Sequence, residues 1–194
     1  MSKREPLSQE QRETALKDIL GPDREAMVGA AKLLSADAST TSRLLELLEP
    51  ERRIETRHAI LYALSWHDDL ALWGLMVRIL EDRSEAPKVR GQASEGLAYL
   101  FNKVSADSRE FEIAVKALLD ALKDPSPEVR YCALFALGSS NHPPLIPALK
   151  EMLADKTPVE GWVGTVADAA SRAIEWIGWP RPKPVDPSDE DERK

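Results

Sequence analysis

The chain has 194 residues, 43% of them hydrophobic and 30% charged, which is the composition of a soluble globular protein long enough to bury a core. Its net charge of -7 argues against nucleic acid as a partner, because broad attraction to phosphates needs clustered Lys and Arg. The single Cys132 excludes an internal disulfide, and no apolar stretch typical of a signal peptide or a membrane span follows the first charges. We therefore expect a cytoplasmic protein without a membrane segment.

Amphipathic segments with helical spacing follow one another along the chain. The first, residues 8–20, opens with Ser8 and Gln11 in the pattern of a capping box. Bulkier segments follow at residues 42–48, 70–80, 111–122 and 145–153. No segment shows the period of two that is typical of a strand, so the sequence predicts an all-α fold.

Between these segments a stripe of small or aliphatic residues recurs five times. It occupies positions three, six and seven after an anchor residue, and the anchors lie 33 to 40 residues apart. The anchors are Arg24, Arg57, Arg90, Arg130 and Ala167. These three positions share one face of an α-helix, and small side chains there let a second helix approach closely. Each copy therefore predicts the second helix of an antiparallel pair.

The clearest copy is "DPSPEVRYCALFALG", residues 124–138, with weaker copies at residues 85–100 and 52–65. These residues resemble HEAT repeats, and more closely the short bacterial repeats called PBS-lyase HEAT-like repeats. The resemblance covers about residues 8–178 and implies an α-solenoid of about five helix pairs within residues 1–180. After Trp179 the sequence becomes rich in proline and charge, so we expect residues 181–194 to form a disordered tail, with a polyproline II ligand as the alternative.

In the resembled family, an Asp after the first helix and an Arg in the second form a ladder between units. The corresponding six-residue spacing occurs at Asp18/Arg24, Glu51/Arg57 and Asp124/Arg130. In the third copy Asp82 stands eight residues before Arg90, and the fifth copy has no Arg. We therefore expect the ladder to be irregular at those two copies.

The second helices are expected to line the concave side of the solenoid. Positions one, four, five and eight after each anchor lie opposite the core face and provide the candidate partner-binding residues. The candidates are His58, Tyr62, Glu95, Tyr131, Phe135, Asp168 and Arg172. One interpretation is an aromatic patch with an acidic rim that attracts a basic protein. The alternative is that positions four and five only pack between neighbouring second helices. His58 and Tyr131 are expected to point most directly outward.

Other candidate sites have simpler structural interpretations. Trp66, His67, Asp68 and Asp69 could form a metal or acid–base site, but a helix cap with Trp66 covering the core is favoured. Cys132 is interpreted as a packing residue rather than a nucleophile. Trp162, Trp176 and Trp179 are expected to close the C-terminal end of the stack, and no stacking ladder of tryptophans is predicted.

The resemblance implies a non-catalytic module that binds another protein, with no cofactor. Such a module could be an adaptor within a multi-protein assembly, or an immunity protein that inhibits a basic toxin. The alternative is an enzyme of the phycobilin lyase or alkylpurine DNA glycosylase type, since both are built from similar repeats. The predicted groove opposes the glycosylase, because acidic residues outnumber Lys32, His58 and Arg172.

Overall fold

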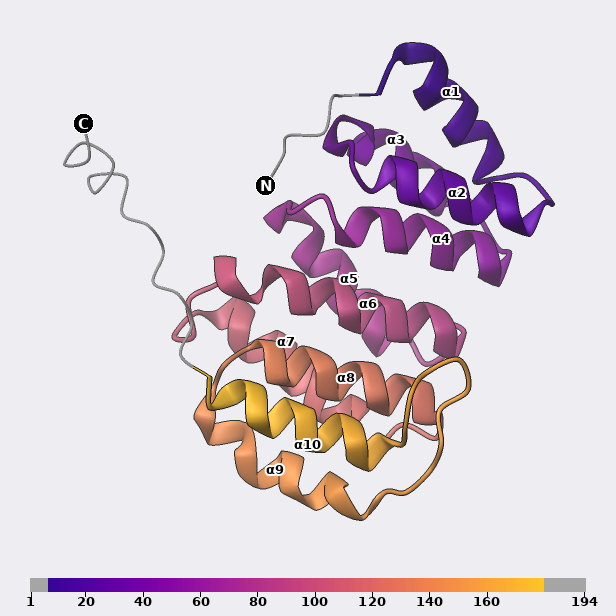
Figure 1. Cartoon of the computed structure of the whole chain (residues 1–194). Coiled ribbons are helices and arrows are strands. Elements are labelled where there is room, and N and C mark those ends of the chain that lie inside the picture. The colour runs from indigo at the N-terminus through magenta and orange to yellow at the C-terminus, as the bar shows by residue number, and fades with distance from the viewer. Residues whose placement is uncertain (1–6, 180–194) are drawn as a thin grey trace, which may run out of the picture.

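A computed structural model describes residues 7–179, and ten α-helices in this range form five antiparallel pairs stacked one after another (Figure 1). The first helices of the pairs are α1 (Gln9–Asp18), α3 (Thr41–Leu48), α5 (Trp73–Glu81), α7 (Arg109–Ala121) and α9 (Ile146–Glu151). The second helices are α2 (Arg24–Leu34), α4 (Ile54–Ser65), α6 (Pro87–Leu100), α8 (Pro127–Ser139) and α10 (Val166–Ile177). The prediction of an all-α solenoid is confirmed, and the predicted tail at residues 181–194 lies outside the described residues.

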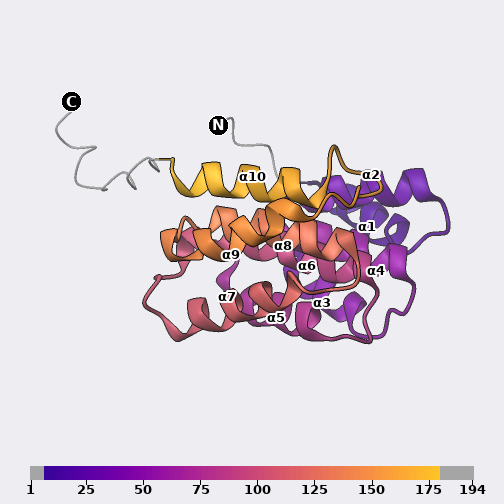
Figure 2. The same ribbon diagram turned by 90° about the horizontal axis from the view of Figure 1, so that it is seen from below.

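Short 3-10 turns join the helices. Ala38–Thr40, Leu70–Leu72 and Pro143–Leu145 precede α3, α5 and α9, whereas Phe101–Lys103 and Met152–Ala154 follow α6 and α9. Seen along the stack, α6, α8 and α10 lie on one side of α5 and α7 (Figure 2). The solenoid therefore has two distinct faces, one formed by second helices and one by first helices.

The helix starts follow from local sequence. The Ser8 hydroxyl accepts the Gln11 N–H at 3.2 Å while the Gln11 side chain accepts the Ser8 N–H at 2.9 Å, so the predicted capping box is present. Prolines stand at the first helical position of α6 and α8, where the missing N–H needs no partner. These local signals explain where α1, α6 and α8 begin.

The recurring stripes form the core between the pairs. Fourteen of their fifteen residues are buried, and the remaining one, Ile174, packs partly buried against the core. The helices α8 and α10 approach closely, since a Cβ added to Gly138 would lie 2.8 Å from the Ala173 Cα. Small residues are therefore required at these positions because two helix backbones almost touch there.

An arginine–carboxylate ladder joins the second unit to the third, the third to the fourth and the fourth to the fifth. Arg57 donates to Glu85 (Nε–Oε2 2.8 Å), Arg90 bonds Asp124, and Arg130 donates to Asp155 (Nε–Oδ2 2.8 Å). Each arginine thus reaches the carboxylate that precedes the second helix of the next unit.

The predicted irregularity of the ladder is wrong in both places. In the third unit Glu85 takes the role assigned to Asp82, and Asp155 ends the ladder in the fifth unit, which needs no arginine of its own. The six-residue spacing has a different basis. Arg57 Nη1 donates to the backbone carbonyl of Glu51 at 3.1 Å, while the Glu51 carboxylate pairs with Arg53 instead.

Candidate protein-interaction surface

Five aromatic side chains form a row across the solvent side of the second helices. We call that side the second-helix face. The row consists of Tyr62 on α4, Trp66 just after α4, Tyr99 on α6, Phe135 on α8 and Trp176 on α10. Successive ring centroids lie 6.3, 4.7, 6.1 and 5.4 Å apart, and the rings of Trp66 and Tyr99 are stacked. Trp66 is 49% exposed and the other four are half-buried, so the aromatic row faces solvent along much of the stack.

The aromatic row follows from the repeat spacing. All five residues stand five or nine positions after an anchor, and residues four apart share one face of a helix. Tyr62 and Phe135 were among the sequence candidates. Trp66, Tyr99 and Trp176 were not, because the candidates came only from positions one, four, five and eight after each anchor. The tryptophans of the row contact tyrosine and phenylalanine rings and not one another. The expectation that Trp66 would cover the core is wrong, since this side chain is 49% exposed.

Tyr131 was expected to point outward, but it is buried. Its side chain is 7% exposed because the loop before α10 places the Trp162 ring against it, with centroids 4.8 Å apart. The Arg172 guanidinium lies 5.5 Å from the centre of the Tyr131 ring and donates a hydrogen bond to its hydroxyl. This face therefore already holds one guanidinium by a cation–π contact.

Two carboxylates on the second-helix face, Glu95 on α6 and Glu128 on α8, form no ion pair with any other described residue. Glu95 stands one helical turn before Tyr99 of the aromatic row, and Glu128 lies beside Gly91, one turn further from the row. Burial raises the pKa of Glu95 to about 7, although hydrogen bonds from Cys132 and Gln92 oppose this effect. Burial also raises the pKa of Glu128. None of the ion pairs found among residues 7–179 includes either side chain. Both carboxylates are thus held in an environment that disfavours their charge.

A small apolar hollow lies at the α2–α4 end of the same face. Its volume is about 210 Å³, and it is lined by Val28, Ala31, Lys32, His58, Ala59 and Tyr62. Burial, with a smaller effect of the Lys88 charge, lowers the pKa of His58 to about 4, so the imidazole is neutral at physiological pH. His58 is half-buried in the wall of this hollow instead of standing fully outward.

Asp168 has a structural task at the start of α10. Its Oδ2 accepts the Thr165 N–H at 2.7 Å, which completes a capping box with the Thr165 hydroxyl. The structure therefore places Tyr62 and Phe135 in the aromatic row and joins Tyr131 to Arg172. Asp168 instead faces its own helix terminus.

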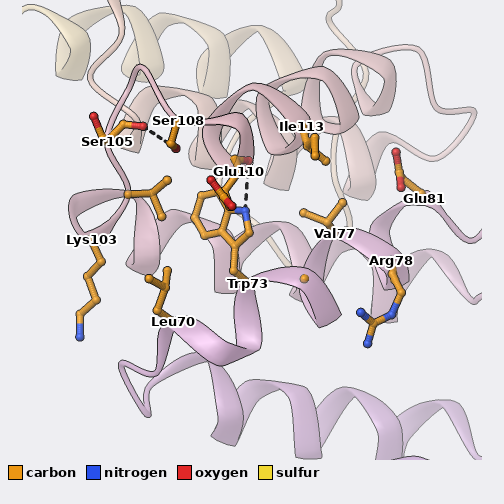
Figure 3. A pocket seen from close by; sticks show the side chains of 12 residues that line it. Leu70, Trp73, Val77, Arg78, Glu81, Lys103, Ser105, Ser108, Glu110 and Ile113 are labelled. Atoms are coloured by element: carbon orange, nitrogen blue, oxygen red, sulfur yellow. Dashed lines mark hydrogen bonds between the residues drawn. The ribbon is translucent and has the colours of Figure 1, made fainter.

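The first-helix side has a groove between α5 and α7 (Figure 3). Its volume is about 660 Å³, and Trp73 forms its floor, with Nε1–H donating to the Glu110 carbonyl at 3.2 Å. Leu70, Val77 and Ile113 supply apolar walls, and the rim carries Arg78 and Lys103 as well as Glu81 and Glu110. Because the rim has both signs of charge, the groove does not select a ligand by charge.

His67 and Asp69, which follow Trp66, have structural roles, and the cap that the favoured interpretation expected is provided by Asp69. His67 is buried, with Nδ1 2.8 Å from the Thr41 hydroxyl and Nε2 2.9 Å from the Leu34 carbonyl. Asp69 accepts the Ala71 N–H at 2.9 Å and caps the following turn. Across residues 7–179, no three His, Cys, Asp or Glu side chains are grouped as metal ligands. Cys132 is buried, and burial raises the pKa of its thiol.

The stacked helix pairs, the shared core stripes and the ladder define a helical-repeat solenoid. Residues 74–163 match the family model of HEAT repeats. No curated protein matches the chain. Within the described residues no helix combines the length and apolar character needed to cross a membrane.

Solved structures with the same fold are designed armadillo repeat proteins. One, in complex with the peptide (KR)4, has a TM-score of 0.55 and 16% identity over 84% of this chain and 80% of its own. A second has a TM-score of 0.50 and 18% identity over the same shares. A third, described as designed for modular peptide recognition, has a TM-score of 0.50 and 16% identity over the same shares. Solenoids of this kind are generally non-catalytic scaffolds that present an extended binding surface.

Proposed function

We propose that the protein is a non-catalytic binding module that holds a segment of another protein against the second-helix face. The aromatic row carries this proposal. Aromatic side chains dominate the binding energy of protein interfaces, and a contiguous exposed group of them on a soluble protein marks an interaction site. The rings come from four successive units, so an elongated ligand fits them better than a compact one.

The frame beneath the row supports the same function. The ladder and the tight α8–α10 contact hold successive units in a fixed register, and fixed anchors lower the ordering cost of binding. The designed armadillo protein in complex with the peptide (KR)4 is a solenoid of this fold that binds a basic peptide. At 16% identity, that likeness supports the mode of binding and not the identity of the partner.

An adaptor in an assembly and an immunity protein against a basic toxin are two forms of this function. An acidic chain with unpaired carboxylates on its binding face is suited to either. The same carboxylates oppose a glycosylase that must hold a phosphate backbone. The aromatic row alone does not favour a bilin lyase over a protein-binding module.

The test is a pull-down from lysate of the native host with the wild-type chain, a Trp66→Ser variant and a Trp179→Ser variant. Trp179 is 67% exposed and lies outside the aromatic row, so it is a matched control for loss of an exposed indole. We expect one stoichiometric protein to be retained by the wild type and by Trp179→Ser, and lost from Trp66→Ser with helicity unchanged. A protein retained equally by all three variants, or retention of nucleic acid or pigment instead, would contradict the proposal.

A further inference from the structure

Glu95 and Glu128 lie on the sides of α6 and α8 that face each other, where the two helices pack closely. A Cβ added to Gly91 would lie 3.6 Å from Glu128 Cγ and 3.3 Å from Cys132 Sγ, so the helices approach closely at this point. Glu95 stands one helical turn beyond Gly91 and one turn before Tyr99, on the same face of α6. The Glu95 carboxylate therefore lies between the α8 side chains and the aromatic row.

The groups around Glu95 and Glu128 provide no free positive charge. From α6 and α8, Glu95 faces Gln92, Tyr99, Tyr131 and Cys132 as well as Glu128 itself. Glu55 and Glu160 add negative charge near Glu128, and Lys88 is the nearest cation. The Lys88 ammonium is already paired with Glu55 at 2.6 Å.

A cationic group of a ligand would supply the counter-charge that these two carboxylates lack. A half-buried carboxylate without a counter-charge is unfavourable, and an incoming guanidinium or ammonium group offsets that cost while the neighbouring rings add cation–π attraction. The contact between Arg172 and Tyr131 shows that this face accommodates a guanidinium over an aromatic ring.

We infer that the segment bound along the aromatic row is an extended basic peptide that places an arginine or lysine side chain against Glu95 and Glu128. This inference rests on the proposed function and specifies the chemistry of the partner. The hollow at α2–α4 adds a second requirement, an apolar side chain beside His58 and Tyr62. It lies two helix spacings from the carboxylates, about 16–20 Å at about 8–10 Å per packed helix pair. An extended chain covers that span with about five or six residues.

The experiment selects peptides of about 12 residues, long enough for that span, from an unbiased display library on the immobilised full chain. The dissociation constant of the best synthetic peptide is then measured by fluorescence anisotropy for the wild type and for Trp66→Ser, Glu95→Gln and Glu112→Gln. Glu112 is an exposed acid on α7, on the other side of the stack, and serves as the matched control.

We expect the selected peptides to be enriched in Arg or Lys. Glu95→Gln should weaken binding about tenfold, as loss of a charge-assisted contact does, while Glu112→Gln leaves it unchanged. Because Glu95 must be ionised to attract the cation, wild-type binding should tighten from pH 6 to pH 8, and this pH dependence should be absent in Glu95→Gln.

The variants distinguish the inference of a basic peptide from the proposed function of binding a protein segment along the aromatic row. Peptides that lose affinity with Trp66→Ser but carry no basic residue, or that bind Glu95→Gln as tightly as the wild type, would overturn this inference and leave the proposed function standing. Peptides insensitive to Trp66→Ser, or a selection that yields no binder, would overturn both.

Discussion

Replacement of Asp124 by alanine tests the ion pair at the centre of the stack. The Asp124 side chain is fully buried and accepts hydrogen bonds from Arg90, with Nη2 at 3.3 Å, and from the Ser126 N–H at 2.9 Å. Arg90 is 5% exposed. Without the carboxylate, the Arg90 guanidinium keeps only its bond to the Glu85 carbonyl at 3.1 Å. A buried charge that loses its partner costs about 3–5 kcal/mol, so we expect a loss of that size in the free energy of unfolding.

The matched control is Arg83→Ala. Arg83 bonds the same carboxylate but is 55% exposed, so solvent screens the pair and its removal should cost less than about 1 kcal/mol. Both values come from urea unfolding followed by far-UV circular dichroism. Equal losses for the two variants, or a loss below about 1 kcal/mol for Asp124→Ala, would show that the guanidinium is rehydrated and that the ladder is not a major source of stability.

The pH dependence provides a second check on the same pair. Burial alone would raise the pKa of Asp124, but the hydrogen bonds from Arg90 and the Ser126 N–H outweigh it and lower that pKa below 3.8. The stabilisation is therefore present above the unfolded-state pKa of about 4 and is lost as the pH falls through the folded-state value. The difference in the free energy of unfolding between the wild type and Asp124→Ala should therefore decrease at acidic pH.

Three further predictions use the same unfolding assay. Gly138→Ala should cost about 1–3 kcal/mol, because the new methyl group meets the Ala173 backbone, whereas Gly96→Ala meets the tips of movable side chains and should cost less. Glu95→Gln should leave the free energy of unfolding unchanged at pH 4, where the Glu95 carboxyl is mostly protonated in both the folded and the unfolded chain. At pH 8 it should raise that free energy by up to about 3 kcal/mol. The reason is that ionising a carboxyl whose folded-state pKa is about 7 destabilises the wild type progressively between pH 4.5 and 7. Trp66→Ser should cost about 2 kcal/mol, because half of the indole is buried and its ring stacks on Tyr99.

The helix pairs were predictable because each rests on a local rule. The stripe at positions three, six and seven fixes which side of each second helix is buried, and the capping box and the prolines fix where helices begin. The candidate site was only partly predictable. Tyr62 and Phe135 follow from the faces of single helices, but a row of rings depends on the register between helices.

The ladder and Tyr131 show why the remaining features were missed. A sequence offset finds a carboxylate within one unit, whereas Arg57 reaches Glu85 in the next unit, and only the packing of the two units reveals that pairing. Burial of Tyr131 depends on the loop before α10, which brings Trp162 onto its ring. That loop has no periodic pattern, so its path could not be deduced from the spacing that predicts the helices.

The ladder and the aromatic row are linked by the geometry of the repeat. The ladder arginines stand at the anchor positions, and the aromatic residues stand five or nine positions later, about 7.5 and 13.5 Å further along each second helix. The ladder joins Arg57, Arg90 and Arg130 each to the following unit. It therefore fixes the register of neighbouring second helices along their axes. The same register brings the ring of Tyr99 next to those of Trp66 and Phe135. Loss of Asp124 should therefore weaken peptide binding although Asp124 lies outside the aromatic row, and Arg83→Ala should not.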